Sequence, residues 1–160
     1  MAVLVSGGRA AFAEVLKSRT LHLAWGAGDP DWDAAALPEP LSATALTDEI
    51  GRVPASATSF AVEDPDGLIE TPTGRWTLVA EPTPNLYLKF DFGFADAPDA
   101  TIREVGLFMD TIVVAGLPEG QRYFEPDEIV DPGTLVALEH FTAFPRSPLI
   151  RQQFEFVLTI

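Results

Sequence analysis

Alternation of apolar and polar residues with a period of two runs through much of this chain, and it limits the possible folds more than any other feature. In residues 85–94 (NLYLKFDFGF) one face carries five apolar side chains: Leu86, Leu88, Phe90, Phe92 and Phe94. Residues 151–160 (RQQFEFVLTI) repeat the pattern. Because successive side chains of a β-strand point to opposite faces, both segments are predicted to be half-buried strands.

Further segments rich in β-branched and aromatic residues predict more strands, for seven or eight in total. They are residues 20–25, 74–81, 101–108, 111–115 and 134–144. Segments rich in Pro, Gly and Asp separate the predicted strands, and these residue types favour turns. We therefore expect strands joined mostly by short polar turns.

Helical spacing occurs in only two places. Near the N-terminus, Phe12, Val15 and Leu16 recur at intervals of three and four residues after a possible cap at Ser6. Residues 44–52 (TALTDEIGR) have the pattern of a helix of about two turns. Without long crossover helices a parallel sheet is disfavoured. The sequence predicts a mainly β protein, an antiparallel β-sandwich or barrel-like domain with one N-terminal helix and one short internal helix.

Length and composition favour one soluble domain over residues 1–160. The chain has 160 residues, of which 47% are hydrophobic, and no change of composition marks a boundary. It has no cysteine, which excludes disulfides, thiolate nucleophiles and cysteine-ligated metals. No secretion signal and no apolar run of about 20 residues is present, so we expect synthesis in a cytoplasm and no membrane insertion.

The charge balance points to protein partners. Ten Lys and Arg residues stand against 24 Asp and Glu residues, for a formal net charge of −14. Such a surface repels the phosphates of nucleic acid and of anionic lipid, so we expect neither as a partner. A basic patch on another protein would be attracted.

Motifs for catalysis or for cofactor binding are weak. Asp29, Asp31 and Asp33 have the spacing that opens a calcium loop, but the sixth position is Ala34 and the twelfth is Pro40. We expect a solvated turn with Trp32 packed beneath it, and neither metal nor cofactor.

The sequence around the two histidines gives no support for catalysis by histidine. His22 and His140 lie in different predicted strands with no third group to orient them, so hydrogen-bonded or exposed histidines are expected. The glycines of SGGR and GAG form no nucleotide-binding fingerprint. The protein is predicted not to be an enzyme.

Three segments resemble a known family in their order along the chain. LHLAWGAGDPDWD (21–33), TALTDEIGR (44–52) and TIREVGLF (101–108) resemble the N-terminal domain of phage tail-collar fibre proteins and related baseplate-associated tail proteins, over about residues 6–110. The resemblance implies a non-enzymatic virion structural protein of the tail tip or baseplate that docks on the tail and serves as an adaptor for tail fibres. It implies other tail or baseplate proteins and tail fibres as partners, a homo-oligomer, and assembly in the host bacterial cytoplasm.

The resemblance also suggests why a buried strand contains Arg103 and Glu104 side by side. If the helix predicted at 44–52 packs on this strand, Arg52 reaches Glu104 in a structural ion pair. Arg103 then points outward. The predicted partner interface comprises Trp32 and Arg103 as exposed anchors, with Phe144 and Arg146 from a later turn.

Other functions remain open at this stage. Exposed aromatic side chains beside acidic loops would suit a receptor- or carbohydrate-binding β-sandwich module, and two distant carboxylates would suit a glycan-cleaving enzyme. Tail-collar fibres continue into a long shaft, whereas this sequence stops at Ile160, so we expect a stand-alone component. A baseplate part and a fibre adaptor need the same docking fold, and copy number, symmetry, neighbours and host receptor are not specified.

Overall fold

The computed structural model describes residues 1–35 and 37–160 and is mainly β, with 45% strand and 12% helix. The predicted fold class is confirmed, since the sheets are antiparallel and one is barrel-like and nearly closed. The described residues form eleven strands, one α-helix and two short 3-10 helices. No helix among them is long and apolar enough to cross a membrane.

The chain divides into two compact units, each assembled from segments far apart in the sequence. Unit 1 comprises Met1–Arg19, Ala55–Phe90 and Gln153–Ile160, and unit 2 comprises Thr20–Pro54 and Asp91–Gln152. Because both units draw on separated stretches, composition along the chain shows no boundary between them. A single domain over 1–160 stays a prediction.

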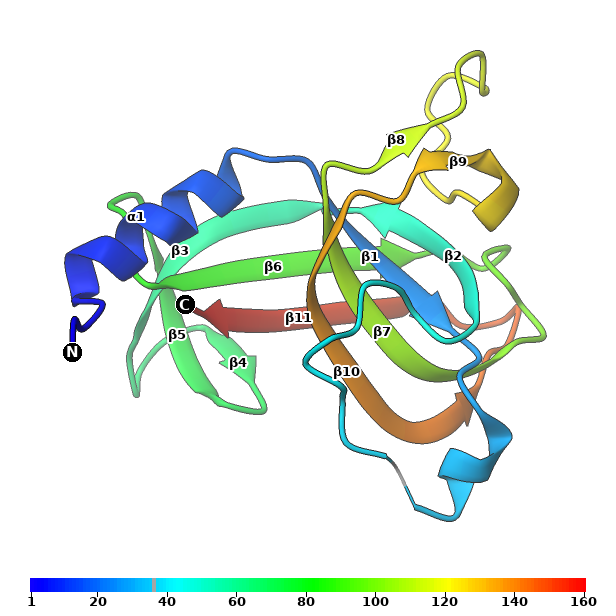
Figure 1. The fold of residues 1–160 in the computed structure, drawn as a ribbon, viewed down its shortest axis with the longest axis horizontal. Helices are drawn as coiled ribbons and strands as arrows, with labels where there is room; N and C mark the ends of the chain where they lie inside the picture. Colours follow the sequence, from blue (N-terminus) through cyan, green and yellow to red (C-terminus); the bar gives the residue numbers. More distant parts are fainter. Residues whose placement is uncertain (36) are drawn as a thin grey trace. The chain divides into compact units, whose positions relative to one another are not determined.

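Unit 1 contains the helix α1 (Ser6–Lys17) and a five-stranded sheet in the order β11-β6-β3-β5-β4 (Figure 1). The strands of this sheet are β3 (Ala57–Glu63), β4 (Ile69–Thr71), β5 (Gly74–Val79), β6 (Asn85–Phe92) and β11 (Gln152–Thr159). The last two residues of β6, Asp91 and Phe92, and the first of β11, Gln152, belong to unit 2. β6 is the long strand that the alternation predicts, with Leu86, Leu88 and Phe90 fully buried. On its other face Tyr87 packs with Ala61 and Trp76, whereas Asp91 is exposed.

The predicted N-terminal helix is present, but it buries a different face. Ala13 and Leu16 are buried, whereas Phe12 and Val15 are exposed. Each exposed residue directly precedes a buried one. Because successive residues are turned by about 100° around a helix, the buried face is rotated by that angle from the face that carries Phe12 and Val15. The N-cap is Val5, which makes no side-chain capping bond, rather than Ser6.

Unit 2 contains a four-stranded antiparallel sheet in the order β10-β7-β1-β2 and a small β8-β9 ribbon (Figure 1). The sheet is made of β1 (Leu21–Gly26), β2 (Glu49–Pro54), β7 (Thr101–Met109) and β10 (Thr134–Pro145). The remaining elements are η1 (Pro30–Asp33), β8 (Ile112–Val113), η2 (Pro126–Glu128) and β9 (Ile129–Asp131). The motif TIREVGLF lies within β7, between β1 and β10.

The helix predicted at 44–52 is wrong. This segment ends a connection from β1 and then enters strand β2, whose Val53 and Arg52 pair with Leu23 and Ala24 of β1. Leu46, just before this strand, packs with Ala24 and Phe108. Sheet pairing satisfies the backbone groups of β2 on a buried surface, and this tertiary gain outweighs the weak helical preference of a nine-residue segment.

Candidate functional site

The charged pair of β7 anchors the connection between β1 and β2, whose described residues are 27–35 and 37–48. Arg103 holds its first part: Nε and Nη2 donate to the two carboxylate oxygens of Asp33 at 2.8 and 2.9 Å, and Nη1 donates to the Ala27 carbonyl at 3.0 Å. The hydrogen bond from Arg103 holds the pKa of Asp33 below its usual value. Arg103 is therefore committed to the protein's own loop.

Glu104 holds the last part of the same connection. Its side chain is 0% exposed, and its carboxylate accepts hydrogen bonds from the amides of Thr47 at 3.1 Å and Asp48 at 2.9 Å. These N–H donors replace the water that a buried carboxylate loses. The strand accepts two adjacent charges because each one binds a different part of one loop.

Strand β10 holds the middle of the connection through His140. The His140 amide donates to Glu39 Oε1 at 2.9 Å, and its ring Nδ1 lies 2.9 Å from the Leu37 carbonyl. The ring stacks on Trp32 with centroids 4.2 Å apart. The hydrogen bond from the His140 amide lowers the pKa of Glu39. The connection is thus held at its start, middle and end.

The glycines of GAG make this arrangement possible. A Cβ at Gly26 would lie 2.5 Å from Glu104 Oε1 and 2.7 Å from the Asp48 carbonyl oxygen. Gly28 has φ +58°, and a Cβ there would lie 2.6 Å from the Trp32 ring. Both glycines therefore allow the chain to approach its neighbours closely. The sequence pattern around them, compared only with nucleotide-binding motifs, did not reveal this role.

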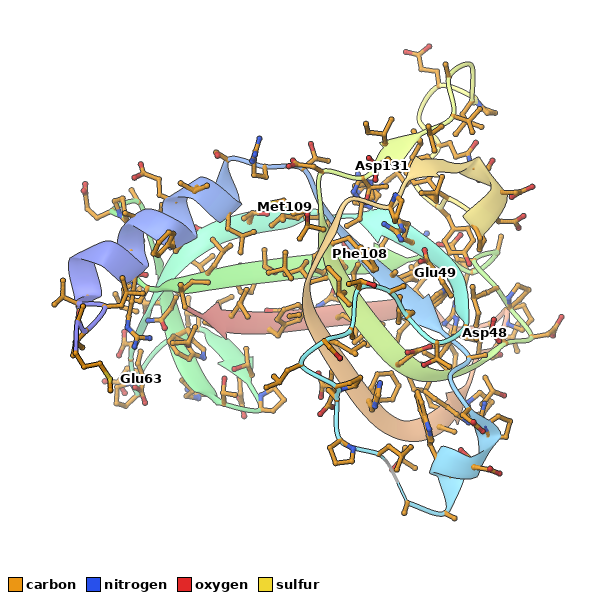
Figure 2. The ribbon with its side chains drawn as sticks, in the orientation of Figure 1. Asp48, Glu49, Glu63, Phe108, Met109 and Asp131 are labelled. Atoms are coloured by element: carbon orange, nitrogen blue, oxygen red, sulfur yellow. The ribbon has the colours of Figure 1, made fainter. Side chains whose placement is uncertain are left out.

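The predicted Arg52–Glu104 ion pair is wrong, because Arg52 pairs with Glu49. Nε and Nη2 of Arg52 each donate to a Glu49 carboxylate oxygen at 2.7 Å, and Nη1 donates to Thr111 Oγ1 and to the Pro132 carbonyl. The guanidinium lies 4.0 Å from the centroid of the Phe108 ring. Figure 2 labels Glu49 and Phe108, two of the neighbours of this buried cation.

Strand register explains the change of partner. Arg52 is opposite Ala24 of β1, whereas Glu104 is opposite Gly26, one step further along the same face. The Arg52 guanidinium extends the other way, toward Phe108, which is opposite His22. The two charges therefore diverge, and each finds partners nearer in space.

The expected exposed anchors are mostly enclosed. Trp32 is 7% exposed under the acidic turn, and Arg146, also 7% exposed, donates to the carbonyls of Gly93 and Ile150. The prediction that Trp32 packs beneath the turn is confirmed, and its exposure as an anchor is corrected. Phe144 is half-buried, with its ring centroid 5.5 Å from that of Phe141. An interface role for these residues and for Arg103 stays a prediction.

The acidic turn is organised by hydrogen bonds within the protein. Asp29 Oδ1 accepts from the Asp31 amide at 2.9 Å and caps η1, while Asp33 binds Arg103. Within residues 1–35 and 37–160, no three His, Cys, Asp or Glu side chains are grouped so as to hold a metal ion.

His22 is buried, not exposed or hydrogen-bonded as the sequence suggested. Its Nδ1 has no partner among the described residues, and its ring meets the edge of Phe124 at 6.0 Å. Burial, and then the charge of Arg52, lower the pKa of His22 to about 4. The residue is therefore neutral at physiological pH and packs in the core.

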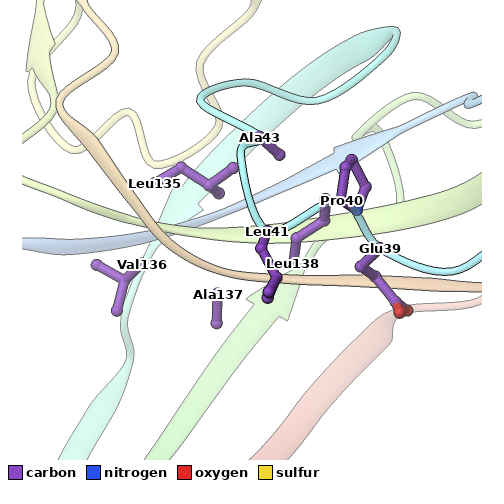
Figure 3. Close-up of a pocket in the computed structure, with 8 residues that line it drawn as sticks. All are labelled: Glu39, Pro40, Leu41, Ala43, Leu135, Val136, Ala137 and Leu138. Atoms are coloured by element: carbon purple, nitrogen blue, oxygen red, sulfur yellow. The ribbon is translucent and has the colours of Figure 1, made fainter.

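A pocket opens where the anchored connection meets β10, and we term it the loop–strand pocket (Figure 3). Its volume is about 270 Å³. Its lining side chains are apolar except for the Glu39 carboxylate, and polar groups make up close to half of the lining surface; the lining residues are Glu39, Pro40, Leu41, Ala43, Leu135, Val136, Ala137 and Leu138. Leu41 and Val136 are both exposed. A held loop thus presents apolar side chains beside a hollow.

Comparison with known families decides the assignment that the motifs suggest. A family model described as "Baseplate wedge 3 tail fiber network component" matches residues 1–160. The chain belongs to this family. The resemblance to phage baseplate- and tail-fibre-associated proteins is therefore confirmed. A comparison with curated proteins gave no match.

Membership of the baseplate wedge family sets the general role of the protein. It is a structural component of the phage baseplate, located in the virion tail, and it interacts with other baseplate or tail proteins. A structural family of this kind indicates a non-enzymatic role. The anchored loop is thus a feature of a structural baseplate protein.

Proposed function

We propose that this baseplate protein docks on a neighbouring tail or baseplate protein through the loop–strand pocket and so serves as an adaptor for tail fibres. The observation that carries the proposal is the β1–β2 connection, held by Arg103, Glu104 and His140, which leaves Leu41 exposed beside the pocket. A side chain from a partner would fill the hollow and bury Leu41 and Val136.

Pre-organisation makes this surface suited to binding. Ordering a mobile loop on association lowers affinity, and a loop already held by hydrogen bonds avoids much of that loss. Apolar side chains gathered around a hollow are typical of the desolvated centre of a protein interface. Glu39 at the edge and the net charge of −14 favour a partner with a basic rim.

The further details of the role rest on the family. A homo-oligomer would repeat the docking surface around the tail, and docked fibres would contribute to host attachment. Assembly would take place in the host bacterial cytoplasm before the virion is released. Light scattering of the purified protein tests the homo-oligomer: a mass that stays at one subunit over a wide concentration range contradicts it.

Two substitutions test the docking surface. Leu41→Asp and Val136→Asp, combined in one chain, place charges at the pocket while leaving the fold intact, since both side chains are exposed. Produced with the other baseplate proteins, the variant should fail to co-sediment with assembled baseplates. Circular dichroism should show a folded protein.

The matched control is Leu68→Asp, which changes an exposed leucine in unit 1. This variant should co-sediment like the wild type. Normal incorporation of the pocket variant would refute docking at this surface, and equal loss in the control would show that any exposed leucine has the same effect.

A further inference from the structure

A second pocket in unit 2 gathers arginine and aromatic side chains, and we term it the arginine pocket. Its volume is about 360 Å³, and it is lined by Asp91, Phe92, Gly93, Phe94, Asp96, Gly120, Arg122, Tyr123 and Arg151. It shares no residue with the loop–strand pocket, so an inference about it does not depend on the proposed function.

The distribution of positive charge in unit 2 is uneven. The unit contains five arginines and no lysine. Arg52 and Arg103 form two-point ion pairs with carboxylates. The other three, Arg122, Arg146 and Arg151, lie in or next to the arginine pocket. The lining also includes Asp91 and Asp96, so the pocket places the two exposed arginines Arg122 and Arg151 beside two aspartates.

Arg146 supports one wall of the pocket from within the protein. Its Nη2 donates to the carbonyls of Gly93 at 2.8 Å and Asp96 at 3.4 Å, and Nη1 donates to the Ile150 carbonyl, next to Arg151. The Asp96 carboxylate accepts from the Gly93 amide at 2.6 Å. These bonds hold the 93–96 turn that contributes Phe94.

The aromatic lining is also fixed in place. Tyr123 Oη donates to the Ile50 carbonyl and accepts from Trp25 Nε1, each at 3.2 Å. Phe92 stacks on Trp25 with ring centroids 3.7 Å apart. Phe94 is 46% exposed, and the Arg151 guanidinium lies 4.8 Å from its centroid.

Arg122 and Arg151 are the cations that remain available to a ligand. Arg122 donates to the Pro54 carbonyl through one nitrogen, and neither residue forms an ion pair within residues 1–35 and 37–160. A guanidinium presents five donors that match a carboxylate geometrically. Two guanidinium groups beside an exposed aromatic ring suit a ligand that has both carboxylates and apolar groups.

We infer that the arginine pocket binds an acidic peptide segment of a neighbouring protein. Carboxylate side chains of the segment would meet Arg122 and Arg151, its apolar atoms would cover Phe94, and its backbone N–H groups would face Asp91. Arg and aromatic residues together are the composition of protein interface centres, which favours a peptide over an acidic glycan.

Fluorescence anisotropy with a labelled oligoglutamate peptide tests the inference on the full-length protein. An oligoglutamine peptide of equal length is the uncharged comparison. The glutamate peptide should bind saturably and more weakly as salt is raised, since exposed charges are screened. Arg122→Gln combined with Arg151→Gln should weaken binding about tenfold or more, equivalent to about 1.4 kcal/mol.

Two control variants show whether peptide binding depends on these two arginines in particular. Arg75→Gln removes an exposed arginine from unit 1, where it pairs with Glu70, and should bind like the wild type. The Leu41→Asp and Val136→Asp variant should also bind normally, which separates this inference from docking at the loop–strand pocket. Absence of saturable binding, unchanged affinity in the double arginine variant, or tighter binding of oligogalacturonate than of oligoglutamate would overturn the inference.

Discussion

Replacing Glu104 by alanine tests the central claim that β7 anchors the β1–β2 connection through buried charge. The carboxylate is fully buried and accepts the amides of Thr47 and Asp48. Alanine would leave both N–H groups without an acceptor and open a space the size of the lost side chain. Water reaches such a site poorly, so the desolvation of the amides is not recovered.

The expected loss of stability follows from these two bonds. A hydrogen bond to a charged group contributes roughly 1.5–3 kcal/mol, and an unsatisfied buried donor costs about 1–3 kcal/mol. For two amides we expect Glu104→Ala to lower the free energy of unfolding by about 4 kcal/mol. Domains are stable by only about 5–15 kcal/mol, so this is a large fraction of the total.

Glu104→Gln refines the same test. The amide oxygen can still accept from one backbone N–H, but the amide nitrogen would face the other, so roughly half of the loss is expected. Urea unfolding followed by tryptophan fluorescence measures all variants, with Glu119→Ala as an exposed control expected within about 0.5 kcal/mol of the wild type. A Glu104→Ala protein as stable as this control would refute the anchoring role.

Three further predictions concern the same unit. The pKa of His22 falls from 6.5 to about 4 on folding, so as the pH is lowered the unfolded chain takes up the proton before the folded protein does. Protonation of His22 therefore does not reduce the free energy of unfolding above pH 6.5, and reduces it by up to roughly 3 kcal/mol as the pH falls to 4. His22→Gln should make urea midpoints less sensitive to pH over that range, and an unchanged slope would contradict this. Arg103→Lys loses the two-point bond to Asp33, so limited proteolysis should cut the β1–β2 connection faster; wild-type cleavage rates would argue against the anchor. Gly26→Ala should lower the melting temperature, because its Cβ would meet the Asp48 carbonyl oxygen at 2.7 Å, whereas Gly7→Ala, with open space around it, should not.

Strands and the order of motifs could be predicted because both are read directly from the sequence, without knowledge of which segments meet in space. The alternation in residues 85–94 identified β6, and the periods near the two ends identified α1 and β11. The motif TIREVGLF, together with the two segments before it, pointed to the family that the chain belongs to. Each strand or motif is recognised from neighbouring residues, and the order of the motifs is read directly along the chain.

The partners of charged side chains could not be read from local pattern. Arg52 binds Glu49, which is three residues away, and also Pro132, which is 80 residues away. The choice between Glu49 and Glu104 depends on the register of β1 with both of its neighbours. A register shift of one residue would move each side chain to the opposite face.

Side-chain alternation and motif order are properties of the covalent chain, so they were enough to establish a mainly β protein with the motifs of a baseplate family. Long-range packing was needed to make residues 49–54 a strand, to stack Trp32 on His140, and to fix one loop with Arg103 and Glu104. Each of these outcomes depends on which surfaces meet across distant segments. Burial and hydrogen bonding at such contacts outweigh local preferences of a fraction of a kcal/mol per residue.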